Sequence, residues 1–68
     1  MVAVCRDGDA YLVYWSPAPG YRALVTVRGP ARTARIAFIS RRRAVDLRVT
    51  CMDGQPWVGE NEREPGDD

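Results

Sequence analysis

Apolar side chains recur at every second position along most of the chain, from residue 1 to about residue 52. A period of two is typical of a β-strand with one buried face, whereas an amphipathic helix would show a period of 3.6. The alternation falls into five runs rich in Val, Ile, Tyr and Trp, which predict strands at residues 2–6, 9–16, 21–28, 33–40 and 44–52. Turn-forming stretches separate the runs, and one of them, Asp7-Gly8, is a preferred pair for a type I′ hairpin turn.

Antiparallel pairing of successive strands brings apolar residues opposite one another on a single face. The pairs include Cys5 with Ala10, Leu12 with Val25, Val25 with Ile36, and Ile36 with Val49. Shifting any register by one residue would destroy this match, because side chains alternate between the two faces. The sequence therefore predicts an all-β fold, a five-stranded antiparallel meander. A sheet this small must curl to enclose a core, so we expect a small SH3-like or OB-like barrel, named as an analogy of shape.

The two faces of the predicted sheet differ in composition. The predicted core consists of Ala3, Cys5, Leu12, Tyr14, Val25, Val27, Ile36, Phe38, Leu47, Val49 and Cys51. The opposite face is more apolar than a solvated face should be. It carries an apolar patch of Val13, Leu24, Ala37 and Ile39, with Trp15 beside it and Arg22, Arg35 and Arg48 around it. Such a patch usually marks a contact surface, which predicts a protein interface.

The length of 68 residues allows one domain. We assign residues 1–58 to a small β-barrel domain and residues 59–68, rich in Gly, Pro and acids, to an acidic tail without regular structure. Within the domain, Trp57 has three interpretations: it caps one end of the barrel, which we favour, it belongs to a short sixth strand, or it anchors a partner. Because so small a core is marginally stable, a homodimer is a further expectation.

Cys5 and Cys51 lie in the first and last predicted strands, on the core face and in the same row across the sheet. If the first strand meets the last, the two sulfurs come within range of a disulfide that would stabilise a small core. The alternative, which we favour, is two reduced thiols that pack as small apolar side chains.

Catalysis has little support in the sequence. The chain contains no His, which removes the commonest general base and metal ligand. Ser16 and Ser40 therefore have no imidazole to activate them, and two Cys alone cannot complete a structural zinc site. No glycine pattern resembles a phosphate-binding loop. We expect a protein that is not an enzyme and that needs no metal and no cofactor.

The longest unbroken apolar run, residues 10–15, is far shorter than the roughly 20 residues of a membrane-spanning helix. Arg6, Asp7 and Asp9 also interrupt the N-terminus before the apolar region of a signal peptide could form. We therefore expect a cytoplasmic protein with no membrane partner.

The distribution of charge is the most informative feature for function. The formal net charge is only +1, but residues 1–52 contain nine Arg against three Asp, a balance of +6, and residues 53–68 contain one Arg against six acids, a balance of −5. A basic body with exposed aromatic side chains is typical of nucleic-acid binding. The predicted contacts are Arg22, Arg28, Arg35, Arg41, Arg42, Arg43, Arg48, Trp15 and Tyr11.

Two pairings support that interpretation, since the predicted register places Trp15 beside Arg22 and Tyr11 near Arg35. The acidic tail would compete with nucleic acid for the basic surface and so weaken non-specific binding. The alternative is an interaction or adaptor module that dimerises, or docks on a larger partner, through the apolar patch. In that case the arginines merely keep the surface solvated.

Overall fold

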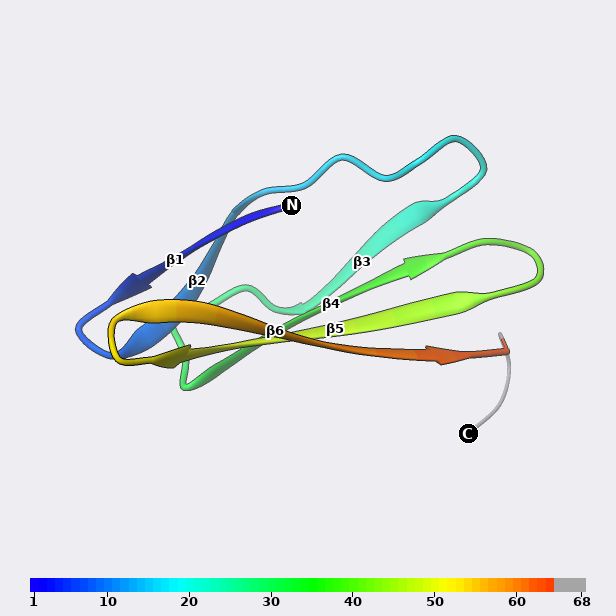
Figure 1. The fold of residues 1–68 in the computed structure, drawn as a ribbon. Coiled ribbons are helices and arrows are strands. Elements are labelled where there is room, and N and C mark those ends of the chain that lie inside the picture. Colours follow the sequence, from blue (N-terminus) through cyan, green and yellow to red (C-terminus); the bar gives the residue numbers. More distant parts are fainter. Residues whose placement is uncertain (65–68) are drawn as a thin grey trace.

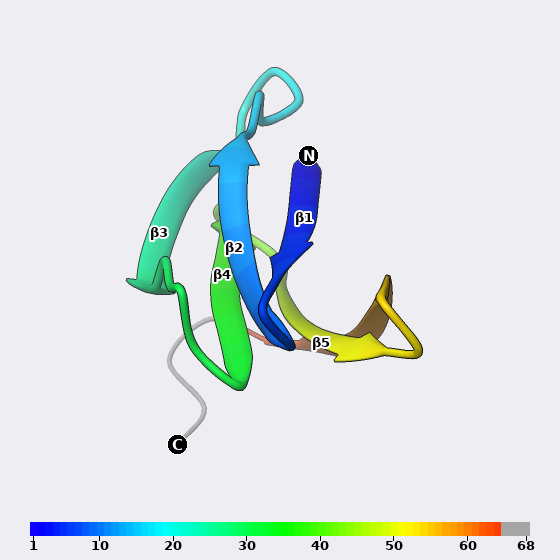
Figure 2. The same cartoon turned by 90° about the vertical axis from the view of Figure 1, so that its left-hand side faces the viewer.

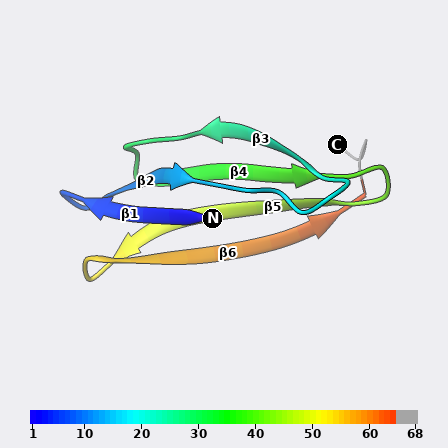
Figure 3. The ribbon, with the colours of Figure 1, turned by 90° about the horizontal axis from the view of Figure 1, so that it is seen from above.

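The computed structural model, described here for residues 1–64, is an all-β fold of six antiparallel strands in two sheets (Figure 1). The strands are β1 (Val2–Arg6), β2 (Asp9–Tyr14), β3 (Arg22–Val27), β4 (Thr33–Ile39), β5 (Ala44–Met52) and β6 (Gln55–Arg63). β1 and β2 form a hairpin, and the other four form a sheet in the order β3-β4-β5-β6 (Figure 3). All five predicted strands begin and end within two residues of the predicted bounds, and the first and the fifth coincide with them.

The hairpin of β1 and β2 packs against one face of the four-stranded sheet, here called the inner face, and the sheet curves around it (Figure 2). The core lies between the two layers. Its buried residues are Ala10 and Leu12 from β2, Ala34 and Ile36 from β4, and Val49 from β5. Backbone hydrogen bonds join the layers at one edge, where Leu12 N donates to Arg28 O (2.9 Å) and Ala10 and Ala31 bond to each other.

Most of the predicted core is confirmed, but two aromatic residues exchange their predicted places. Tyr14, predicted in the core, is 60% exposed. Trp15, predicted on the opposite face, packs against the core cluster. β2 ends at Tyr14, so the strict alternation of faces no longer applies to the residue after it.

The predicted meander is wrong at its second connection. β2 does not pair with β3, so the expected pairing of Leu12 with Val25 is absent, and the chain between them crosses from one sheet to the other. Leu12 N donates instead to Arg28 O, beyond the end of β3. No closed barrel forms among the described strands, because both sheets are open.

The hairpin registers are right for two turns and displaced for one. Cys5 pairs with Ala10 and Val25 with Ile36, as predicted. Ile36, however, pairs with Leu47 and not with Val49. The turn begins one residue earlier than predicted, at Ser40: Ser40 N donates to Arg43 O (2.8 Å), and Arg43 N donates to Ser40 Oγ (3.2 Å). The resulting shift of two residues leaves every side chain on its predicted face.

β6 extends through Arg63, so residues 59–63 form part of a strand, and the predicted loss of regular structure near Gly59 is wrong there. The strand follows a turn in which Asp53 and Gly54 both have positive φ, and it pairs with β5 along its whole length. The sixth-strand interpretation of Trp57 is therefore confirmed. The preferred capping interpretation is wrong, since the residue is 61% exposed. The end of the predicted tail, residues 65–68, lies outside the described residues.

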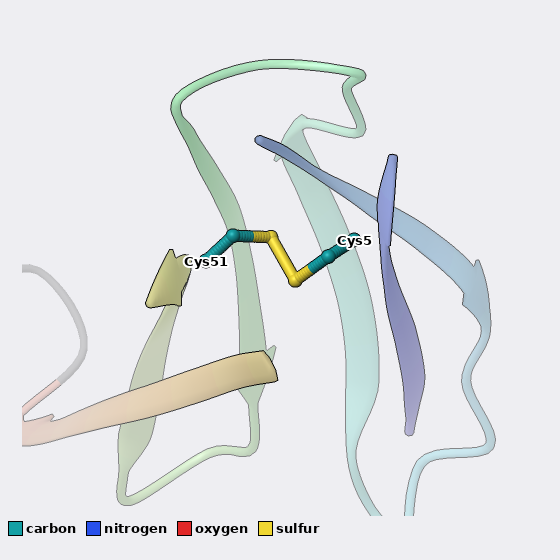
Figure 4. The surroundings of a disulfide bond; sticks show 2 residues. All are labelled: Cys5 and Cys51. Atoms are coloured by element: carbon teal, nitrogen blue, oxygen red, sulfur yellow. A yellow bond between two sulfur atoms is a disulfide. The ribbon is translucent and has the colours of Figure 1, made fainter. Parts of the chain in front are cut away.

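A disulfide joins Cys5 of β1 to Cys51 of β5 (Figure 4), with the two Cα atoms 5.8 Å apart. The favoured expectation of two reduced thiols is therefore wrong. The bond links the hairpin to the four-stranded sheet at a place where the two layers share no strand pairing. It complements the backbone hydrogen bonds at the β2 edge.

Candidate nucleic-acid interface

The face of the four-stranded sheet that turns away from the hairpin is here called the outer face, and its side chains form a regular grid. Residues directly opposite in an antiparallel pair share a face, so the strand pairings define rows across the sheet. The rows are Thr33–Thr50–Trp57, Arg35–Arg48–Gly59, Leu24–Ala37–Asp46–Asn61 and Arg22–Ile39–Ala44–Arg63. Three of the predicted nucleic-acid contacts, Arg22, Arg35 and Arg48, lie on this face.

Arg35 and Arg48 are the central feature of the outer face. They lie directly opposite each other on β4 and β5, and both are exposed. Neither side chain forms an ion pair or hydrogen bond with another residue in the described range 1–64. Two like charges in this arrangement destabilise the free protein. The next position in the row is Gly59, which contributes no side chain, and an Arg48 terminal nitrogen lies 3.9 Å from where a Cβ at that position would stand.

The acidic residue next to this pair on the outer face is already engaged. Asp46 accepts hydrogen bonds from Arg63 Nε (2.7 Å) and from Arg63 Nη2 (3.4 Å). This ion pair is about one-third exposed, and its Arg63 lies opposite Ala44 of β5. Because its charge is balanced by Arg63, Asp46 does little to neutralise the arginine pair.

Hydroxyl groups and an aromatic ring adjoin the arginine pair. Thr33 and Thr50 line one shallow depression together with Arg35, Arg48 and Gly59. Trp57 follows Thr50 in the neighbouring row and is exposed. Thr33, Thr50 and Trp57 are not among the predicted contacts, and only the pairing of β6 with β5 brings Trp57 onto the arginine-bearing face. A signal did exist in the Asp53-Gly54 pair, which favours a hairpin at that position.

Arg28 forms a separate cluster with the two predicted aromatic contacts. Its guanidinium carbon lies 5.1 Å from the centre of the Tyr11 ring and 5.6 Å from that of Trp15, while its Nε donates to the Leu12 carbonyl oxygen (3.1 Å). The predicted neighbours, Trp15 with Arg22 and Tyr11 with Arg35, are wrong because β2 does not join the larger sheet. Arg28 stabilises the crossing between the sheets, and its contacts occupy the rings predicted to stack on bases.

The arginine loop between β4 and β5 is only partly free to bind a ligand. Arg43 pairs with Glu62 of β6 (2.8 Å), and both side chains are about half exposed. Arg41 and Arg42 are exposed, and Arg41 lines a depression with Arg22 and Ile39 at the far end of the outer face. The basic surface therefore extends from the Arg35–Arg48 pair toward this loop.

The predicted apolar patch is divided by the topology. Val13 lies on β2 in the other sheet, and Ala37 is only 5% exposed, whereas Leu24 is 55% exposed and Ile39 is half-buried. Ala37 is buried because Leu24 and Asp46 flank its small side chain in the same row. Dimerisation or docking through Leu24 and Ile39 stays a prediction.

Two further features of the described residues bear on function. They contain no group of three or more Cys, Asp or Glu placed to hold a metal ion. Within the same range, no helix is long and apolar enough to span a bilayer.

No family model, no curated protein and no solved structure matches the chain.

Proposed function

We propose that the protein is a non-enzymatic binding module that holds nucleic acid on its outer face. The observation that carries this proposal is the cross-strand pair of Arg35 and Arg48, which has no acidic partner in the described part of the chain. Nucleic-acid backbones supply phosphates, and the planar guanidinium matches a phosphate with two parallel hydrogen bonds. A phosphate between the two side chains would turn their mutual repulsion into a shared attraction.

The acidic residues of β6 modulate this surface in the proposal. Glu62 pairs with Arg43 and so withdraws one arginine of the loop from a ligand. Removal of residues 59–68 would be a poor test of this role, because it would also remove half of β6 and Gly59 from the arginine row. Glu62→Gln keeps the strand and frees Arg43. We expect it to tighten binding about two- to five-fold at low salt, in keeping with a half-exposed ion pair.

The proposal is tested by the fluorescence anisotropy of labelled DNA and RNA oligonucleotides over a range of salt concentrations. Each phosphate neutralised by the protein contributes about 0.7–0.9 to the slope of log K against log salt. Arg35→Gln/Arg48→Gln should lower the affinity and reduce this slope by about 0.7 or more. The matched control, Arg6→Gln/Arg32→Gln, removes the same charge from exposed positions outside the outer-face rows.

Two results would contradict the proposal. One is the absence of binding to DNA and RNA at low salt. The other is an equal loss of affinity in the two double variants, which would show that net charge alone attracts the nucleic acid.

The disulfide bears on where this binding would take place. Thiols in the cytosol are kept reduced, so the Cys5–Cys51 bond weighs against the predicted cytoplasmic location. We favour an oxidising compartment, and the redox state of the cysteines in the native host, measured by thiol alkylation and mass spectrometry, is the test.

A further inference from the structure

We infer that the outer face binds single-stranded nucleic acid, with a backbone phosphate between Arg35 and Arg48 and an unpaired base stacked on Trp57. This inference rests on the proposed function and specifies the form of nucleic acid that the site takes. It concerns an aromatic residue that lies away from the Arg28 cluster.

Trp57 and the arginine pair are placed as neighbours by the strand pairing. Trp57 is opposite Thr50, and Gly59, two positions along β6, is opposite Arg48. Residues two positions apart on a strand are roughly 7 Å apart and share a face. Gly59 adds no side chain beside the Trp57 position, and the Arg48 guanidinium lies over that glycine.

The exposure of Trp57 indicates an unfilled contact. The other tryptophan, Trp15, packs against the core and holds the Arg28 guanidinium near its ring. Among residues 1–64, no cation lies over the Trp57 ring, which is 61% exposed on a strand at the edge of the sheet. A large exposed aromatic ring next to unpaired arginines is the combination that binds a base and its phosphate together.

Stacking on a side chain requires a base with a free face, which determines the form of the nucleic acid. In a duplex each base is already stacked and paired, and a sheet face four strands wide does not enter a groove as a helix or a two-stranded ribbon does. In a single strand the base can turn toward Trp57 while its phosphate stays on the arginines. Thr33 and Thr50, in the same row as Trp57, present hydroxyl groups that can donate to phosphate or sugar oxygens.

The experiment compares three labelled ligands of 12 nucleotides: a single strand of DNA, the duplex of the same sequence, and an abasic strand that keeps the phosphates but has no bases. Each is titrated with the wild-type protein and with Trp57→Ala and Trp57→Phe. The matched control is Tyr14→Ala, because Tyr14 is an aromatic residue of the other sheet with nearly the same exposure, 60% against 61%.

We expect the single strand to bind more tightly than the duplex. Trp57→Ala should weaken single-strand binding by about 5- to 150-fold, the range for loss of one stacked base. It should leave binding of the abasic strand unchanged. Trp57→Phe should retain most of the affinity, which also shows that the fold is intact, and Tyr14→Ala should have no effect. Single-strand binding should quench tryptophan emission in the wild type and much less in Trp57→Phe.

The inference is overturned if the duplex binds as tightly as the single strand. It is also overturned if Trp57→Ala weakens the abasic strand as much as the natural one, or has no effect on either. In those cases, loss of binding in Arg35→Gln/Arg48→Gln would leave the proposed function standing. Absence of binding to all three ligands would remove both.

Discussion

The Cys5–Cys51 disulfide should supply a large share of the stability of this domain. It closes a loop with a sequence separation of 46. In the chain-entropy account, closing a loop of this length lowers the conformational entropy of the unfolded state and so raises its free energy by about 4 kcal/mol at 25 °C. A domain of 68 residues has a typical free energy of unfolding of only about 3–10 kcal/mol. The double variant Cys5→Ala/Cys51→Ala should therefore lose about half of its stability or more.

Urea denaturation, followed by tryptophan fluorescence and circular dichroism, measures this loss. Small domains have a dependence of about 1 kcal/mol per molar urea, so a loss of about 4 kcal/mol lowers the midpoint by roughly 4 M. The wild-type protein under reducing conditions should match the double variant. The double variant itself should not respond to reducing agent, which controls for effects of the agent on other groups.

A midpoint that falls by less than about 1 M, in the variant or on reduction of the wild type, would refute the reasoning. Such a result would mean that the hairpin is held to the sheet by its backbone hydrogen bonds and by the core alone. A variant much less stable than the reduced wild type would also count against it, since the side-chain change would then matter more than the bond.

Three further predictions concern the junction between the layers and the core. Gly29→Ala should destabilise the protein by more than about 2 kcal/mol in thermal denaturation, because Gly29 has positive φ and a Cβ would collide with the Ala10 carbonyl oxygen. The control Gly8→Ala, at a position with positive φ but open space around the Cβ, should cost only about 1 kcal/mol. Arg28→Lys should lower the free energy of unfolding by about 1–2 kcal/mol in the same assay. It keeps the positive charge but loses the planar guanidinium that contacts the Tyr11 and Trp15 rings and donates to the Leu12 carbonyl oxygen. Leu12→Ala should cost about 2–5 kcal/mol in urea denaturation, because the side chain is fully buried, and a cost below 1 kcal/mol would contradict the assigned core.

The strands were predictable because the alternation of apolar residues is a local signal. The period of two identifies which residues face inward, and Asp7-Gly8 fixes the β1–β2 register through its turn type. The same signal cannot reveal a shift of the strand register by two residues, because such a shift leaves every side chain on the same face. The β4–β5 register depends instead on the side chain of Ser40, which makes a hydrogen-bonded turn one residue earlier than the apolar pattern indicates.

The break between β2 and β3 could not be inferred from alternation, because both strands have the pattern that a continuous sheet would also require. It depends on long-range contacts, among them the hydrogen bond from Leu12 N to Arg28 O. Composition was misleading for β6. Its acidic residues resemble a tail, yet pairing with β5 and the ion pairs of Glu62 and Arg63 accompany its extended structure.

The candidate site was predictable in part for the same reasons. The strand pattern placed Arg35 and Arg48 on the face away from the core, where the structure has them, but in two neighbouring rows. The two-residue shift of the β4–β5 register brings them directly opposite each other. Trp57 could be added only once its strand had a partner. The arginines that were wrongly grouped with Tyr11 and Trp15 show the reverse case, since their predicted contacts depended on a β2–β3 pairing that does not form.

The disulfide closes residues 5–51 into a covalent ring and leaves β6 outside it. The ring, from Cys5 to Cys51, contains the buried core cluster. Among the described residues, β6 is held by its hairpin turn, by its pairing with β5, by contacts with β1 and by ion pairs of Glu62 and Arg63. β6 can therefore open without breaking the ring, and its amide protons should exchange with solvent before those of β4. Trp57 and Gly59 lie on β6, outside the ring, whereas Arg35 and Arg48 lie within it. A ligand that contacts both groups would therefore hold β6 against the ring. As more of the outer face is occupied by ligand, the amide protons of β6 should become better protected from exchange with solvent.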